Sequence, residues 1–134
     1  MKDATRQTLV DILAWCLMPN HFHLVLCQKE NNGIAKFMHR LGTGHTMYIN
    51  LKYGRSGHVF QGPFKAKIVK KDEYLTHITR YVHLNPLELI NHGWKEQGIK
   101  DINSGKKFIL EYPSYYKQKF NHNQQYLIQI YIRC

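Results

Sequence analysis

The chain has 134 residues, of which 43% are hydrophobic and 13% aromatic, enough for the core of one compact domain and too few for two. No run of about 18 apolar residues is present, which argues against a transmembrane helix, and the N-terminus lacks the apolar stretch of a signal peptide. Nineteen Lys and Arg against nine Asp and Glu give a net charge of +10 and a pI near 9.6, so a polyanion is the expected partner. We therefore expect a single domain over residues 1–134 in the cytoplasm, associated with the nucleoid.

The three cysteines, Cys16, Cys27 and Cys134, form neither an even disulfide set nor a Cys-x-x-Cys pair. Disulfides persist in oxidising compartments, and an odd set without close spacing is typical of free thiols in a reduced one. This agrees with a cytoplasmic location.

Two apolar segments near the N-terminus predict a β-hairpin. Residues 12–18 and 21–27 each have strand character, and Pro19-Asn20 between them is a turn signal. Alternate side chains of a strand point to opposite faces, so His21 and His23 share one face while Phe22 points into the core. Two adjacent imidazoles form a chelating pair for zinc, iron or manganese, and an oxygen ligand would favour magnesium or manganese. Taken alone, a His-x-His sequence more often lies on a solvent-exposed face of a sheet without binding a metal.

A structural zinc site is an alternative use of the same segment. Cys16 and Cys27 flank the histidine pair, and thiolates are common zinc ligands. Strand parity places Cys16 on the face opposite the histidines, and the spacing matches no common zinc module. A small zinc-stabilised nucleic-acid-binding protein stays open as a third hypothesis.

Residues 33–51 predict an amphipathic helix, despite two internal glycines, and short strands are expected at residues 59–60 and 66–69. Residues 31–71 contain no acidic side chain. A basic run is often only a solvated face, but one this long is typical of a phosphate-binding surface. The predicted DNA-binding residues are Lys36, Arg40, Lys52, Arg55, Lys65, Lys67 and Lys70.

A second helix is predicted from Asp72, as its capping residue, to about Leu84, since the residue before Pro86 is biased away from helical geometry. Tyr81 and Asn85 lie four residues apart on one stripe of this helix. Such a stripe is usually core. Here, however, the Asn85 amide oxygen could share a metal with the histidines, and Tyr81 could attack a phosphodiester to form a phosphotyrosine that conserves the bond energy.

Positive charge or a metal must assist a tyrosine, whose ordinary pKa of about 10 makes it a weak nucleophile at neutral pH. Arg80 and His83 are near in sequence but point away from the stripe. Beyond Pro86, glycines at 93, 98 and 105 predict loops.

Three segments together carry a resemblance to a known family. They are WCLMPNHFHLVL at residues 15–26, GRSGHVFQGPFKAKIV at residues 54–69 and DEYLTHITRYVHLNP at residues 72–86. They resemble the single-tyrosine transposases of the HUH superfamily (His, hydrophobic residue, His), in the REP-associated form. The likeness covers residues 13–86, with a fainter echo in EYPSYY at residues 111–116. The combination of MPNHFHL with RYVHLNP at this separation is highly specific.

The resemblance implies an α+β domain with a ferredoxin-like antiparallel sheet and helices on one face. It implies Mg²⁺ or Mn²⁺ held by His21 and His23, with Asn85 at the position of a polar ligand, and Tyr81 as the nucleophile that becomes linked to a 5′ phosphate. The implied partners are single-stranded DNA with hairpins and a second copy of the chain, with no membrane.

Two departures from the family pattern bear on these expectations. Family members begin with an extra strand and helix before the region of Leu13, so the first sheet strand is expected to be missing. Pro63 stands where they usually carry arginine, which removes one DNA contact. Residues 87–134 are expected to form a C-terminal extension. The main alternative to a transposase is therefore a DNA-binding protein of the same origin that has lost catalysis.

Overall fold

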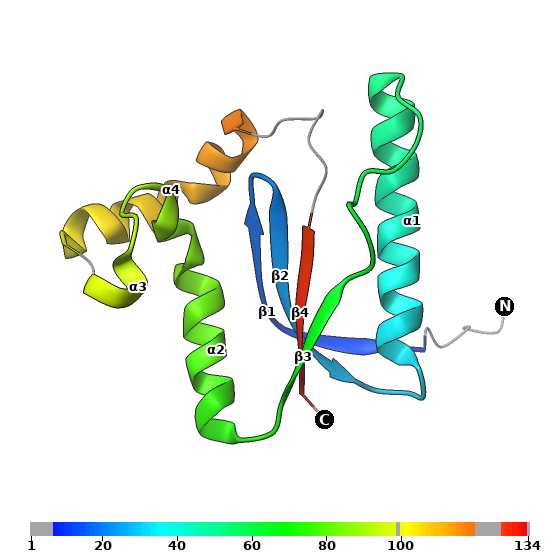
Figure 1. Ribbon diagram of the computed structural model, residues 1–134, viewed down its shortest axis with the longest axis horizontal. Coiled ribbons are helices and arrows are strands. Elements are labelled where there is room, and N and C mark those ends of the chain that lie inside the picture. The colour runs from blue at the N-terminus through cyan, green and yellow to red at the C-terminus, as the bar shows by residue number, and fades with distance from the viewer. Residues whose placement is uncertain (1–6, 99, 120–126, 134) are drawn as a thin grey trace, which may run out of the picture.

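One four-stranded sheet organises the chain, in the order β1-β2-β4-β3 (Figure 1). The computed structural model describes residues 7–98, 100–119 and 127–133, with side chains described up to residue 111. The strands are β1 Val10–Met18, β2 His21–Gln28, β3 Lys65–Val69 and β4 Leu127–Arg133. The helices are α1 Gly33–Tyr53, α2 Asp72–Leu84, the 3-10 helix η1 Asn85–Leu89, α3 Trp94–Gln97 and α4 Ile102–Lys119.

The β1-β2 hairpin confirms the predicted pair of strands. The strands pair antiparallel from Met18 opposite His21 to Val10 opposite Gln28, with an irregularity between Ile12 and Ala14. Such an irregularity changes which face the following side chains occupy. Val10 therefore packs with the α1 side, whereas Ala14 packs with the α2 side.

Helices α1 and α2 cover opposite faces of the sheet (Figure 1). Leu24 and Leu26 of β2 form one buried cluster with Ile34 and Met38 of α1. The alternate face of the hairpin forms a second cluster with α2. Its members are Ala14, Cys16, Met18, Val25, Val69, Ile78 and Val82. Strand alternation therefore places the odd-numbered residues of β2, His23 included, under α2.

The α+β class is confirmed, while two details of the expected architecture are wrong. β4 pairs parallel with both β2 and β3, so the sheet is mixed rather than antiparallel. The helices lie on both faces rather than on one, because β2 is apolar on both of its faces and each face requires cover. The segment expected to be a C-terminal extension supplies β4, which occupies an interior position in the sheet.

The helix beginning at Gly33 and ending at Tyr53 agrees closely with the predicted span. Glycine is required at its start because a Cβ on Gly33 would collide with the backbone carbonyl oxygen of Leu9. In α2, Asp72 is the first helical residue and Lys71 the cap, with no side-chain capping bond, so the predicted capping role of Asp72 is wrong. Its carboxylate still lies in the first turn, where the helix dipole favours negative charge.

Residues beyond Pro86 are more helical than predicted. Asp101 begins α4 as a cap, since one carboxylate oxygen accepts the Asn103 amide at 3.0 Å and the other the Ser104 hydroxyl at 2.5 Å. Gly105 lies buried inside this helix rather than in a loop. Within the described part of the chain, no helix has the length and apolar character needed to cross a membrane.

Candidate active site

The histidine pair lies at the start of β2, next to the hairpin turn. The ring centroids of His21 and His23 are 4.9 Å apart, and His23 is buried whereas His21 is partly exposed. His21 Nδ1 is 2.7 Å from Asn20 Oδ1. A carboxamide oxygen only accepts, so Nδ1 of His21 donates, and its Nε2 keeps the lone pair that a metal requires. Asn20 therefore orients His21.

Both imidazoles are held in their neutral form. Burial lowers the pKa of His23 to about 4, with further contributions from the positive charges of His21 and Lys95. Burial, and then Lys95, also lowers the pKa of His21. A neutral imidazole is the form that coordinates a metal. At neutral pH the pair is thus chemically ready to act as a ligand without first losing a proton.

Tyr81 of α2 faces this pair across the interface between helix and sheet. Its ring meets the His23 ring edge-on, with centroids 5.9 Å apart. Ile78 and Val82, on either side of Tyr81 in sequence, are buried in the cluster that α2 forms with the sheet. This packing fixes the rotation of α2 and directs Tyr81 toward the start of β2. The structure therefore brings together the two motifs that the sequence singled out.

Asn85 is the first residue of η1, directly after α2, and its side chain is 2% exposed. A buried carboxamide needs polar partners, and a metal ligand role is one way to supply them. Among the described residues, no group of three His, Cys, Asp or Glu side chains could hold a metal. Asn85 as an oxygen ligand beside the two histidines stays a prediction.

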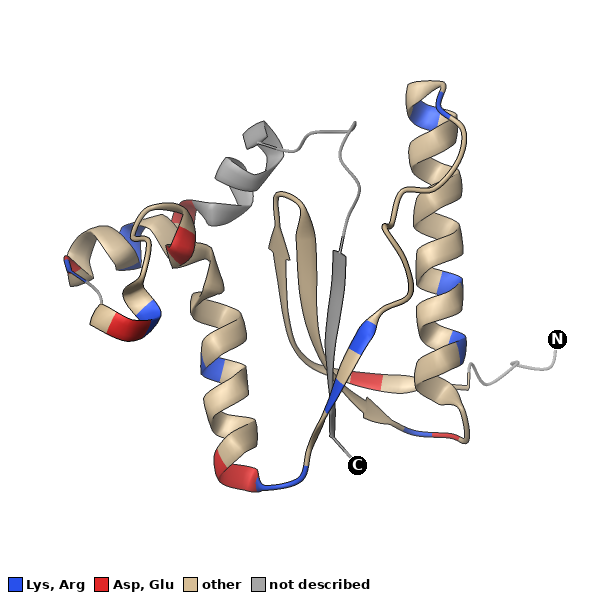
Figure 2. Cartoon of the chain, in the orientation of Figure 1, with Lys and Arg blue, Asp and Glu red and all other residues tan. Residues whose placement is uncertain are grey.

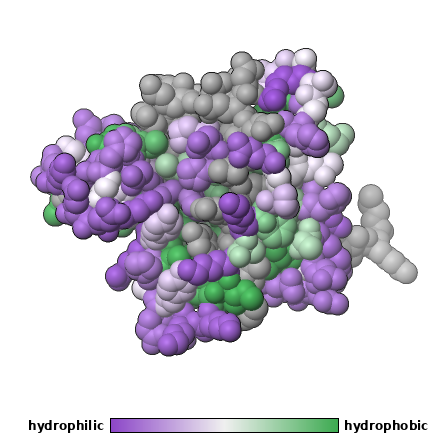
Figure 3. Space-filling view, viewed as in Figure 1, coloured by the Kyte–Doolittle hydropathy of each residue, from purple (hydrophilic) through white to green (hydrophobic). Residues whose placement is uncertain are grey.

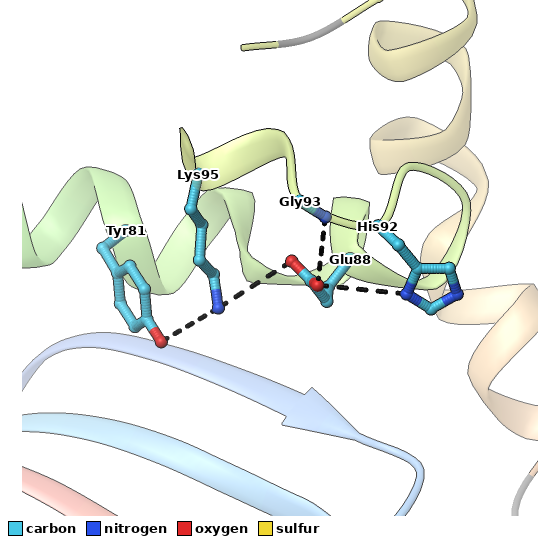
Figure 4. A network of polar contacts seen from close by, with 5 residues as sticks. All are labelled: Tyr81, Glu88, His92, Gly93 and Lys95. Carbon is cyan, nitrogen blue, oxygen red and sulfur yellow. Dashed lines mark hydrogen bonds and ion pairs between the residues drawn. The ribbon is translucent and has the colours of Figure 1, made fainter. Parts of the chain in front are cut away.

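Lys95 is a site residue that the sequence analysis missed. Its Nζ lies 3.1 Å from the Tyr81 hydroxyl oxygen and 4.6 Å from the centre of the Tyr81 ring. It also lies 4.0 Å from a carboxylate oxygen of Glu88, and Figure 4 shows it between the two. Lys95 is in α3, beyond Pro86, where glycine-rich sequence predicted a loop and no motif marked a functional position.

Cys16 lies on the same face as His23, not on the opposite one. The two residues are direct cross-strand partners in the hairpin, because parity counted along one strand does not carry through a two-residue turn. Cys27 instead pairs with Asp11, near the other end of β1. Five residues of strand separate the two positions by roughly 16 Å. A zinc site that uses both cysteines is therefore excluded, and Cys134 lies outside the described residues.

The predicted DNA-binding residues divide between the two faces of the sheet. Lys36 and Arg40 lie exposed on α1, and Lys36 forms an ion pair with Glu30 at 2.6 Å. Lys65 and Lys67 share the α2 face with Val69. Blue segments of the ribbon, which mark Lys and Arg, lie on β3 and on α1 in Figure 2. Three further candidates lie near the ends of these elements. Lys52 is in the last turn of α1, Arg55 follows α1, and Lys70 follows β3.

Lys65 and Lys67 lie on the face of the sheet that also carries His23. In the sheet, Lys65 and His23 are both paired with position 129 of β4, which places them in one row across three strands. Lys67 lies over the Tyr74 ring of α2, with Nζ 5.1 Å from its centre. A strand spacing of about 4.8 Å sets Lys65 roughly 10 Å from His23. That spacing suits a nucleic-acid strand crossing this face.

Fold and site together define an α+β protein with a histidine pair on an inner strand and a tyrosine above it on a helix. The family described as "Transposase IS200 like" matches residues 1–85, which include the hairpin, β3 and all of α2. The chain belongs to the IS200-like transposase family, whose members process DNA in transposition. No curated protein and no solved structure matches it.

Proposed function

We propose that this transposase cleaves and rejoins single-stranded DNA, with Tyr81 as the nucleophile and a covalent phosphotyrosine as the intermediate. The observation that carries the proposal is the contact between Tyr81 and His23, whose rings meet at 5.9 Å from separate elements. A nucleophile beside a pair of metal-binding side chains is the arrangement that phosphodiester transfer requires. The REP-associated form of the family is part of this proposal.

His21, His23 and Asn85 fit a divalent cation by the chemistry of their donor atoms. Two neutral imidazoles lie 4.9 Å apart, and a carboxamide oxygen would turn the preference toward Mg²⁺ or Mn²⁺. When bound, the cation would polarise the scissile phosphate. Lys95 repels a cation at this place, so we expect tight binding only together with a DNA phosphate, which supplies anionic oxygen.

The residues around the histidine pair have separate tasks in this mechanism. Asn20 fixes the orientation of His21, and the packing of Ile78 and Val82 holds Tyr81 in position. Attack by the Tyr81 oxygen links it to the 5′ phosphate and frees a 3′ hydroxyl, and the reverse reaction rejoins the strand without external energy. A hairpin-bearing element end as substrate and a homodimer as the active form complete the proposal.

Covalent adduct formation on a denaturing gel tests the proposal. Single-stranded hairpin oligonucleotides are incubated with Mg²⁺ or Mn²⁺ and with wild type, Tyr81→Phe, His21→Ala or Tyr74→Phe. We expect an adduct from wild type and from Tyr74→Phe, none from Tyr81→Phe, and at least a roughly 100-fold loss in His21→Ala, the scale seen when a metal centre or key stabilising group is lost. Tyr74→Phe is the matched control, since it alters another tyrosine of the same helix.

The result that contradicts the proposal is equally distinct. Salt-sensitive DNA binding without any adduct would favour a DNA-binding protein that has lost catalysis. An adduct that persists in Tyr81→Phe would assign the linkage to another side chain. EDTA should abolish the wild-type adduct, and its survival in EDTA would remove the metal from the mechanism.

A further inference from the structure

The cationic side chain that touches the Tyr81 oxygen belongs to Lys95, which follows the matched segment and lies on a different helix. We propose that Lys95 positions the Tyr81 oxygen for attack and compensates its negative charge when the phosphotyrosine bond forms and breaks. The inference rests on the proposed function, since it assigns Lys95 a part in the same reaction. It is independent of which cation the histidines hold.

The direction of the hydrogen bond supports this role. An ammonium group has three donors and no acceptor, so at 3.1 Å Lys95 donates and the Tyr81 oxygen accepts. One lone pair of the phenol oxygen is thereby occupied, and the other is left for the phosphorus. The contact fixes where the reactive lone pair points, which a tyrosine ring alone does not, because rotation about its C–O bond is free.

Lys95 is itself held in place by a short network (Figure 4). Glu88 Oε2 is 4.0 Å from Nζ of Lys95. Glu88 Oε1 accepts the Gly93 amide at 3.4 Å and lies 3.9 Å from Nδ1 of His92. Gly93 has a φ of 78°, a left-handed conformation that glycine adopts without strain and that starts α3 directly beside Glu88. The ammonium thus sits between a carboxylate and a phenol.

Lys95 and its carboxylate partner Glu88 are both only partly exposed. The Lys95 side chain is 35% exposed, and that of Glu88 is 34% exposed. An ion pair at this exposure contributes little to stability, so the network is better explained by orientation than by folding energy. Neither Arg80 nor His83 offers a comparable contact, since both are exposed on α2.

A fixed ammonium group beside the Tyr81 oxygen would assist both cleavage and rejoining of the DNA strand. In cleavage, a lone pair of the Tyr81 oxygen forms the bond to phosphorus, and the bond from phosphorus to the 3′ oxygen breaks with its electron pair on that oxygen. The phenol proton passes to solvent water, and the 3′ oxygen takes a proton from solvent. In rejoining, the 3′ hydroxyl attacks after losing its proton to solvent, and the phenolate leaves with the electron pair. A preorganised donor stabilises this charge as it develops.

The experiment compares Lys95→Met, Lys95→Arg and Lys29→Met with wild type in single-turnover adduct formation over a range of DNA concentrations. Methionine keeps the length of the apolar stem and removes the charge. Lys29→Met is the matched control, because it removes one positive charge from an ion pair, with Asp11 at 2.6 Å, at the far end of β2. Thermal melts and circular dichroism verify that each variant folds.

We expect Lys95→Met to lower the rate at saturating DNA by about 10- to 100-fold, the range for losing one charged donor from a transition state. DNA affinity should stay within about two-fold of that of Lys29→Met, whose rate should equal the wild-type rate. Lys95→Arg should recover part of the lost rate, because a guanidinium also donates and remains charged.

Each contrary outcome has a separate meaning. A wild-type rate in Lys95→Met overturns the inference and leaves the proposed function standing. Weaker DNA binding with a normal rate at saturation overturns it too, since Lys95 would then be a phosphate contact. Lys95→Arg no faster than Lys95→Met would assign the loss to packing. If wild type itself forms no adduct, the proposed function fails and this inference fails with it.

Discussion

The Cys16 thiol lies under α2, directly across the hairpin from His23. Burial raises its pKa from 9.0 to about 12, and only the thiolate is nucleophilic. With Cys27 and Cys134 replaced by serine, we expect native Cys16 to react with iodoacetamide at pH 8 at least roughly 100-fold slower than in urea, because the pKa shift and the lack of access act together. Labelling followed by mass spectrometry measures this rate.

Cys27 provides the comparison, since it is only partly buried. The protein with Cys27 as its single thiol should react quickly without urea. Equal rates at the two positions would show that α2 does not cover Cys16.

The burial of Cys16 also makes the free energy of unfolding depend on pH. Between about pH 9 and pH 12 the folded thiol keeps its proton while the unfolded one loses it. The contribution of Cys16 to the free energy of unfolding therefore falls as pH rises above about 9.

Among the helices and strands, those whose formation depends on nearby sequence were predicted correctly. The hairpin, α1 and α2 follow from alternation, helical spacing and turn residues, and each was placed within about two residues of its true bounds. β4 and α4 were missed for different reasons. The interior strand β4 is defined by partners that are distant in sequence. Helix α4 was missed because Gly105 was interpreted as a loop residue. Its start could have been predicted from Asp101 as a capping residue with Ser104 three residues later.

In the candidate site, too, residues marked by local sequence patterns were predicted, whereas a residue brought in by the tertiary fold was not. His21, His23 and Tyr81 were found because their spacing is short and their chemistry distinctive. Lys95 could not be found, since it reaches Tyr81 from a four-residue helix and a single lysine in a basic chain carries no signal. The face of Cys16 was assigned wrongly because it depends on the register across a turn, not on position within one strand.

Two glycines of α1 predict opposite responses to alanine. A Cβ at Gly44 meets nothing within 4 Å, whereas one at Gly33 strikes the Leu9 carbonyl. Gly44→Ala should raise the free energy of unfolding by about 0.5–1 kcal/mol, since alanine loses less backbone entropy in a helix. Gly33→Ala should lower it by about 1–3 kcal/mol through the steric clash.

Urea denaturation of the two variants and wild type measures both changes. The pair controls for helix propensity, because each substitution makes the same chemical change in the same helix. A stabilising Gly33→Ala would mean that the chain before β1 does not pack against the start of α1.

For the whole molecule, charge and apolar surface are distributed so that one face suits DNA better than the other. Figure 3 shows hydrophobic surface between hydrophilic margins in the lower half of the view, and Ile68 of β3 is 56% exposed. Strand alternation turns Ile68 away from the face that carries Lys65 and Lys67. Those two lysines therefore lie on the α2 face with Tyr81, whereas Lys36 lies on α1, on the other side of the sheet.

This division predicts unequal effects of charge removal on DNA binding. Replacing Lys65 and Lys67 together by alanine should weaken single-stranded DNA binding by roughly ten-fold at 0.1 M salt and reduce the slope of log K against log salt by about 1.4, since each phosphate contact on a single strand contributes about 0.7. Replacing Lys36 and Arg40 removes the same charge from α1, so net charge is matched. Fluorescence anisotropy across a salt series measures both slopes. Equal losses in the two variants would mean that DNA contacts both faces, whereas a loss confined to β3 would place its path along the row that contains His23.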